Sequence, residues 1–92
     1  MALLHSMVNG EVASGISIQD RGLHYGDGLF ETIAFVKNQL IFWNEHYQRL
    51  LNGCKTLAIQ CPTEQSLKND IEKLCHLNQD VNAAVIKIIV TR

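Results

Sequence analysis

The segment from Ala84 to Thr91 constrains the fold more than any other part of this 92-residue chain. Most of its residues are β-branched, and its apolar side chains follow no helical period. A run of this kind is typical of a β-strand that is covered on both faces. The fold must therefore include a sheet that takes up this strand.

Two consecutive helices are predicted before this strand. The first covers about residues 45–58, with Asn44 as its N-cap, and its apolar stripe consists of Tyr47, Leu50, Leu51, Cys54, Leu57 and Ala58. Gly53 in this helix indicates close packing against another backbone. The second helix begins after Pro62 with Thr63 as its cap, ends near Asn78, and has an apolar stripe formed by Leu67, Ile71, Leu74 and Cys75.

The first half of the chain predicts strands. Asn9-Gly10 lies between apolar residues and indicates a tight hairpin within residues 6–12. A second hairpin is predicted from apolar residues 29–36, a polar turn at 37–39 and apolar residues 40–42. Strands at both ends and two adjacent helices predict an α+β fold, with an antiparallel-rich sheet packed against two helices.

Composition and charge exclude several classes of protein. A net charge of −1 without clustered lysines and arginines argues against nucleic-acid and membrane-surface binding. No apolar run approaches the roughly 20 residues that span a bilayer, and no secretory signal is visible. The spacing of Cys54, Cys61 and Cys75 fits no metal site, so we expect reduced thiols, a cytoplasmic location and no metal. Small molecules or protein surfaces are the expected partners.

The glycine-rich loop at residues 20–28 is the first candidate for a binding site. Glycines at 22, 26 and 28 allow another group to approach the main chain closely, and Tyr25 lies among them. The loop matches neither a Walker loop nor a dinucleotide fingerprint. A plain turn between strands, with Tyr25 as an ordinary half-buried aromatic residue, remains the alternative.

Two cations are further candidates. His46 and Arg49 are three residues apart on the first predicted helix, and the planar fork of arginine fits a phosphate or carboxylate. Arg49 is thus a candidate anion anchor, with a solvated surface cation as the alternative. Lys87 interrupts the apolar strand and must reach an edge, pair with a carboxylate or open into a cavity. A covalent role through its amine is a further possibility.

Three motifs together resemble a known family. Residues 20–33, residues 46–50 and residues 87–92 resemble the N-terminal part of class IV aminotransferase-like enzymes, the fold type IV pyridoxal-phosphate proteins. The resemblance covers about residues 8–92. It implies that Arg49 binds the cofactor phosphate, that Tyr25 lies beside the substrate pocket, and that Lys87 lies on a strand that approaches the substrate. Phe35 departs from the pattern, because many relatives carry a basic residue there.

The resemblance also implies a domain organisation. Residues 1–92 match the small N-terminal domain of a longer two-domain enzyme, and the chain stops directly after its most apolar strand. In this family the lysine that binds the cofactor covalently lies in the second, larger domain. None of the chain's five lysines is in a matching motif. We therefore expect no catalytic lysine and no activity in this chain alone.

Within the family, the short spacers and the opening at residues 8–10 look most like 4-amino-4-deoxychorismate lyase. This resemblance implies a pyridoxal-phosphate-dependent lyase that converts 4-amino-4-deoxychorismate to 4-aminobenzoate and pyruvate in folate biosynthesis, and that acts as a homodimer. The alternatives are a D-amino-acid or branched-chain aminotransferase, and a module without catalysis that serves dimerisation.

Overall fold

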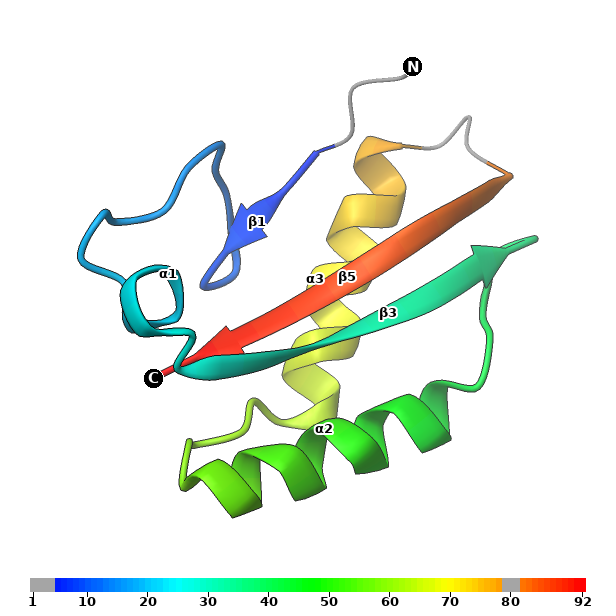
Figure 1. Ribbon diagram of the computed structural model, residues 1–92. Coiled ribbons are helices and arrows are strands. Elements are labelled where there is room, and N and C mark those ends of the chain that lie inside the picture. Colours follow the sequence, from blue (N-terminus) through cyan, green and yellow to red (C-terminus); the bar gives the residue numbers. More distant parts are fainter. Residues whose placement is uncertain (1–4, 79–81) are drawn as a thin grey trace. The chain divides into compact units, whose positions relative to one another are not determined.

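Strand β3 (Gly28–Val36) is the central strand of a three-stranded antiparallel sheet of order β4-β3-β5, and β5 (Ala83–Thr91) lies at one edge of it (Figure 1). They pair along their whole length, from Gly28 opposite Thr91 to Val36 opposite Ala83. Strand β4 (Gln39–Leu40) completes the sheet through a tight turn in which Lys37 and Asn38 have positive φ angles. The predicted hairpin and the predicted final strand are confirmed, although β4 is shorter than expected.

The computed structural model describes residues 5–78 and 82–92, which divide into two compact units. One unit includes Ile18–Cys61 and Asn82–Arg92, and therefore holds the three-stranded sheet. The other unit lies within Met1–Ser17 and Pro62–Val81. With strands and helices in both units, the chain is α+β, as predicted.

The unit without the three-stranded sheet follows its local sequence signals closely. Strands β1 (Met7–Val8) and β2 (Glu11–Val12) form the predicted hairpin around Asn9 and Gly10, both with positive φ. Helix α3 (Glu64–Leu77) begins where Thr63 accepts a hydrogen bond from the backbone of Ser66, and it ends at Asn78. Its buried residues are Leu67 and Ile71. Hairpin, cap and helix end are all confirmed.

Helix α2 (Trp43–Leu57) packs on one face of the sheet. Asn44 is not its N-cap: the helix begins two residues earlier than expected, after Phe42, which has a left-handed backbone conformation and gives no side-chain cap. A two-residue β4 places the helix directly after the hairpin, so the backbone bend at Phe42 replaces a cap. Gly53 packs against the side chain of Leu29 on β3, not against a backbone as predicted.

The buried stripe of α2 is narrower than the sequence indicates. Trp43, Leu50 and Cys54 are buried, whereas Leu51 and Leu57 are 37% and 39% exposed. Ala58 ends the helix in a left-handed conformation. The helix contacts the sheet along one line, so the outer members of the predicted stripe lie at its margin.

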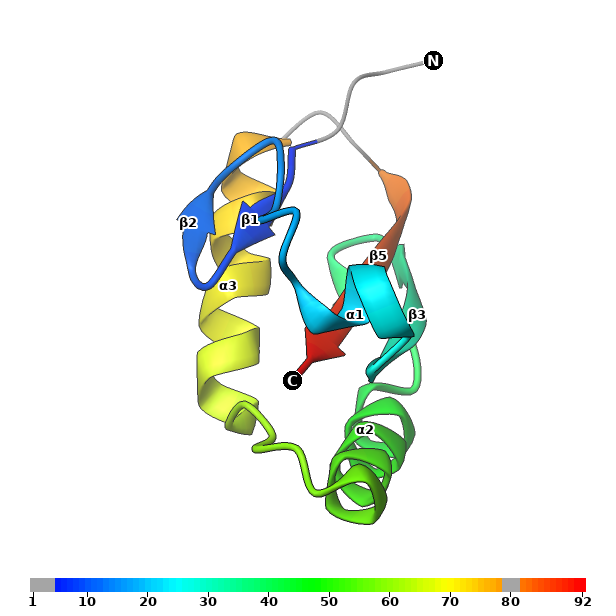
Figure 2. The same ribbon diagram turned by 60° about the vertical axis from the view of Figure 1, so that its left-hand side comes forward.

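A short helix replaces the predicted irregular loop at residues 20–28. Helix α1 (Arg21–Tyr25) begins where Asp20 accepts a hydrogen bond from the backbone of Leu23, and it ends at Gly26 with φ +63°. It lies beside the end of β5 (Figure 2). There, Gly22 leaves no room for a Cβ next to the side chain of Thr91. Gly26 thus ends the helix, and Gly22 allows the close contact with β5.

The two faces of the sheet differ, and this corrects the prediction that the last strand is covered on both. The inner face, toward α2, carries the buried Ile33, Phe35 and Val90. The opposite face, which we call the outer face, exposes Phe30, Val36, Val85 and Ile89 by 39–62%. Positions 84–90 are apolar on both faces except Lys87, which lies on the outer face, so the strand carries only one sequence signal of this difference.

The exposed outer face predicts self-association of the 92-residue chain, because apolar patches of this kind recruit partners. We expect the sedimentation coefficient to rise with concentration. Replacing Val85 and Ile89 together by threonine, which keeps β propensity, should reduce this rise. Ile18→Thr, a change at a residue that is 78% exposed outside the sheet, is the control. A chain that stays monomeric at high micromolar concentration would contradict the prediction.

Candidate functional site

A buried carboxylate on β3 anchors two side chains of α2. Glu31 lies on the inner face between Leu29 and Ile33, and its side chain is only 7% exposed. Arg49 donates from Nε to Oε2 at 2.9 Å and from Nη2 to Oε1 at 2.8 Å. His46 Nδ1 lies 2.7 Å from Oε1 and donates, because an ionised carboxylate can only accept. We call these three residues the Glu31 cluster.

The electrostatics of the Glu31 cluster keep the carboxylate ionised. Hydrogen bonds from Arg49 lower the pKa of Glu31 below its ordinary value. Burial acts in the opposite direction, and the hydrogen bond from His46 adds to the lowering. The net direction is down, so two donors outweigh the cost of burying the charge.

This lowered pKa predicts a pH dependence of stability. The stabilisation from the ionised carboxylate is present above the pKa of an unfolded glutamate, about 4.3, and is lost as the pH falls through the lower folded value. The urea midpoint of the wild-type protein should therefore fall from about pH 5 downward more steeply than that of Glu31→Gln. The other carboxylates titrate in both proteins, so their effect cancels in the difference between the two urea midpoints. Parallel curves between pH 3 and pH 7 would contradict this.

Arg49 is open to a ligand despite its bonds to Glu31. Its side chain is 70% exposed, and the two bonds to the carboxylate use Nε and Nη2. Nη1 is therefore on the side of the guanidinium that turns away from these bonds. A planar cation held along one edge with a donor on the other suits a phosphate or carboxylate oxygen.

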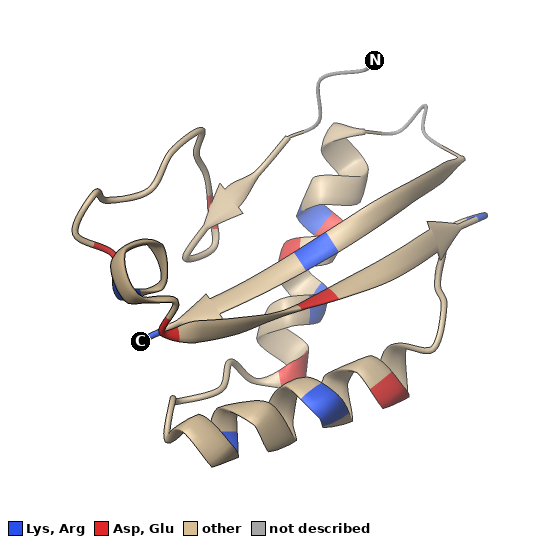
Figure 3. Cartoon of the chain, viewed as in Figure 1, with Lys and Arg blue, Asp and Glu red and all other residues tan. Residues whose placement is uncertain are grey.

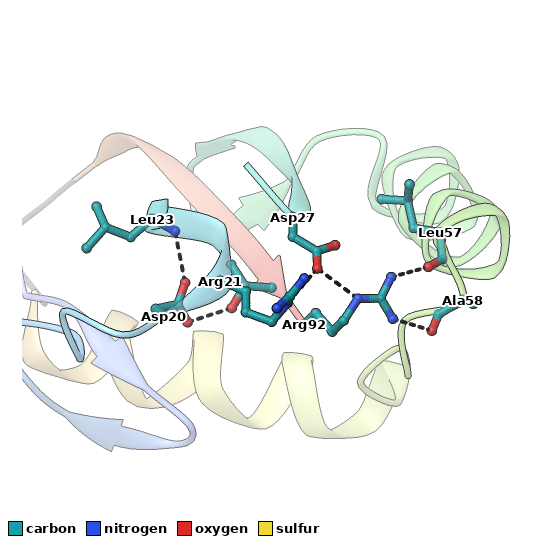
Figure 4. A network of polar contacts seen from close by, with 8 residues as sticks. Asp20, Arg21, Leu23, Asp27, Leu57, Ala58 and Arg92 are labelled. Carbon is teal, nitrogen blue, oxygen red and sulfur yellow. Dashed lines mark hydrogen bonds and ion pairs between the residues drawn. The ribbon is translucent and has the colours of Figure 1, made fainter. Parts of the chain in front are cut away.

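A second polar network joins α1, the end of β5 and the end of α2 (Figure 4). Asp27 accepts hydrogen bonds from Nε of Arg21 at 2.9 Å and Nε of Arg92 at 2.8 Å. Arg92 also donates to the carbonyls of Leu57 and Ala58 at 2.5 and 3.1 Å. The pKa of Asp27 is lowered, first by Arg21 and then by Arg92. This network fixes the end of the glycine-rich segment to the helix that carries Arg49.

Tyr25 lies at the end of α1 and is 72% exposed. The guanidinium of Arg21 lies 5.1 Å from the centre of its ring, and the ring of His24 lies 5.8 Å away. The alternative of a half-buried aromatic is thus wrong. An exposed ring is open to a ligand, and its role in substrate binding stays a prediction.

Lys87 lies on the outer face of the sheet, opposite Thr32 in the register. Its side chain is exposed, and Nζ lies 4.8 Å from the centre of the Phe30 ring. The lysine is accommodated because its face of β5 is open, so no buried carboxylate is needed. An ammonium group over an aromatic ring remains available to an anionic ligand.

The structure does not bring the three predicted site residues together. Strand alternation places Lys87 on the outer face and the Glu31 cluster on the inner face. Within residues 5–78 and 82–92, no hydrogen bond, ion pair or ring contact joins Arg49, Tyr25 and Lys87. The three exposed side chains therefore lie at separate positions on this unit of the chain.

Sequence reasoning missed Glu31, Asp27 and Arg92 as parts of a network. For Glu31 the signal is a carboxylate at an inner position of an otherwise apolar strand, followed by a helix with His46 and Arg49 three residues apart. Such a carboxylate needs partners of opposite charge. Asp27 and Arg92 are 65 residues apart, and no local pattern joins them.

Several other features bear on function. The described cysteines are free, and burial raises the pKa of the Cys54 thiol to about 11, with a contribution from Cys61.

The part of the chain that the structure describes holds no group of three potential metal ligands. None of its helices has the length and apolar character needed to cross a bilayer. Lysines and arginines are distributed over several of the described helices and strands (Figure 3).

Comparisons with known proteins identify a family for this chain. The family model for amino-transferase class IV matches residues 28–92, which include the Glu31 cluster and the paired strands. The chain is 30% identical over 78 residues to D-alanine aminotransferase of Listeria monocytogenes, a match that covers 84% of this chain and 27% of that protein.

Two solved structures share the fold. The crystal structure of 4-amino-4-deoxychorismate lyase from Pseudomonas aeruginosa is 39% identical, has a TM-score of 0.72, and is matched over 91% of this chain and 30% of that one. The PLP-bound form of a hypothetical aminotransferase from Mycobacterium tuberculosis has a TM-score of 0.81 at 19% identity, over 91% of this chain and 32% of that one. The chain thus spans less than a third of the proteins it matches. The family match over residues 28–92 shows that this chain belongs to the class IV aminotransferase family.

Proposed function

We propose that this chain is the N-terminal small domain of a longer pyridoxal-phosphate enzyme, and that Arg49 binds the phosphate of the cofactor. The observation that carries the proposal is the exposed guanidinium of Arg49, held along one edge by Glu31. The donors fit the group: a fixed arginine with a free edge matches the geometry and charge of a phosphate. A solved relative of the same fold is PLP-bound.

Pyridoxal phosphate supplies an electron sink for bonds that break near the amino group of the substrate. The residues of this chain have other tasks. Arg49 holds the phosphate, and the network of Asp27 and Arg92 fixes its helix to the start of β3. The covalent lysine belongs, by this proposal, to the part of the protein beyond residue 92.

We propose that the reaction is the conversion of 4-amino-4-deoxychorismate to 4-aminobenzoate and pyruvate. Support comes from 39% identity to the Pseudomonas aeruginosa lyase over 91% of the chain, whereas D-alanine aminotransferases are 27–34% identical. Lys87 presents its ammonium beside the ring of Phe30, which suits an anionic, ring-shaped ligand, but it lies on the face of the sheet opposite the Glu31 cluster, so its contact with the substrate needs its own test. Tyr25 adds a second exposed ring.

The test is product analysis with the full-length protein loaded with pyridoxal phosphate. Incubation with 4-amino-4-deoxychorismate should give equal amounts of 4-aminobenzoate and pyruvate. Incubation with D-alanine and 2-oxoglutarate should give little glutamate. Amino transfer without 4-aminobenzoate would contradict the lyase proposal and favour a D-amino-acid aminotransferase, the second candidate, which the similarity to the Listeria monocytogenes enzyme supports.

Lys87→Ala tests the substrate side. If the ammonium binds a substrate carboxylate, its loss should raise KM for 4-amino-4-deoxychorismate about tenfold or more. Affinity for pyridoxal phosphate should stay unchanged. The control is Lys55→Ala, which removes an exposed cation from the last turn of α2. An unchanged KM in Lys87→Ala would show that this lysine is a surface residue without contact to the substrate.

A further inference from the structure

Glu31 is the one charged residue that is buried within the described part of the chain. A carboxylate in an apolar sheet face is costly unless it is fully paired. Apolar side chains at this position would cover α2 equally well, as Ile33 and Phe35 do on the same face. The partners of Glu31 therefore indicate what the carboxylate does.

The pairing fixes the orientation of Arg49. An arginine side chain rotates about several bonds, and a 70% exposed one samples many positions unless something holds it. Nε and Nη2 both bond to Glu31, so the carboxylate sets the plane of the guanidinium as well as its place. His46 bonds to Oε1 and holds the carboxylate in turn.

We propose that Glu31 is a positioning residue, which orients Arg49 so that its free edge faces the phosphate of the cofactor. This inference rests on the proposed role of Arg49. It predicts that Glu31 strengthens phosphate binding although its own charge repels a phosphate. Orientation outweighs repulsion because the carboxylate lies on the edge of the guanidinium away from the ligand, and His46 donates to it as well.

The experiment compares pyridoxal phosphate with pyridoxal, which lacks the phosphate. Binding of each to the full-length protein is measured by fluorescence titration, and the ratio of the two dissociation constants reports the phosphate contact alone. A purely structural defect weakens both ligands and leaves the ratio unchanged. The proteins are the wild type, Glu31→Gln, Glu31→Asp, Arg49→Ala and the double variant Glu31→Gln with Arg49→Ala.

We expect Glu31→Gln to reduce the preference for pyridoxal phosphate over pyridoxal about tenfold. This is the lower end of the loss seen at metal sites when a residue that supports a ligand is removed. In the Arg49→Ala background the same change should have no further effect, because Glu31 acts through Arg49. Glu31→Asp keeps the charge with a shorter reach and should reduce the preference less. If Glu31→Gln does not fold, Glu31→Asp takes its place in the comparison. Glu45→Gln, in the first turn of α2, is the control.

The outcomes separate the two proposals. An unchanged preference in Arg49→Ala overturns the phosphate role of Arg49 itself. A reduced preference in Arg49→Ala, together with an unchanged or increased preference in Glu31→Gln, overturns the positioning role alone. An equal effect of Glu31→Gln with and without Arg49 also overturns it, because the carboxylate would then act by another route.

Discussion

Arg49→Ala in the full-length protein is expected to weaken binding of pyridoxal phosphate by about ten- to a hundredfold, because the variant loses one charge-assisted contact to the phosphate. The guanidinium is exposed and already oriented by two bonds to Glu31, so its full contribution is lost on truncation. Equilibrium dialysis at pH 7.5 measures the dissociation constant directly. Low salt is preferable, because ions screen exposed charges.

The control for this prediction is Lys55→Ala on the same helix. It removes one positive charge from α2 without touching the Glu31 cluster, so it accounts for the general effect of net charge. Its dissociation constant should match that of the wild type. If both variants lost affinity equally, Arg49 would contribute only through net charge.

Leu50→Ala is expected to lower the free energy of unfolding by about 2–5 kcal/mol, the range for removing a buried leucine side chain. Leu50 is 1% exposed and lies next to Arg49 in α2, on the face toward the sheet. Alanine is the best helix former, so the helix itself is not weakened and the loss reports packing. Urea unfolding followed by circular dichroism measures it.

The adjacent Leu51→Ala is the matched control, with the same chemical change on the same helix. Leu51 is 37% exposed, and its replacement should cost about 1 kcal/mol or less. Equal losses at the two positions would contradict the account in which α2 contacts the sheet along a narrow line through Leu50.

Local signals predicted the local features. The Asn9-Gly10 turn and the Thr63 cap are both found, because a two-residue turn and a helix cap depend on neighbours within a few residues. The final strand is confirmed for the same reason, since β-branched residues favour it.

Features that depend on distant partners could not be predicted. Phe42 replaces Asn44 at the start of α2 because the preceding hairpin brings the chain directly into the helix. The exposed outer face of β5 follows from what packs on the sheet, and Lys87 is the one residue within positions 84–90 that indicates it. Arg49 was identified from its chemistry, whereas its carboxylate partner 18 residues earlier became visible only in the structure.

The distance between the Arg49 guanidinium and the cofactor phosphate tests the central claim most directly. It can be measured in a crystal structure of the full-length protein with pyridoxal phosphate bound. We predict a guanidinium nitrogen at about 2.7–2.9 Å from a phosphate oxygen, with Nε still bonded to Glu31. A phosphate held by other residues, with Arg49 bonded to Glu31 and otherwise facing solvent, would contradict the claim.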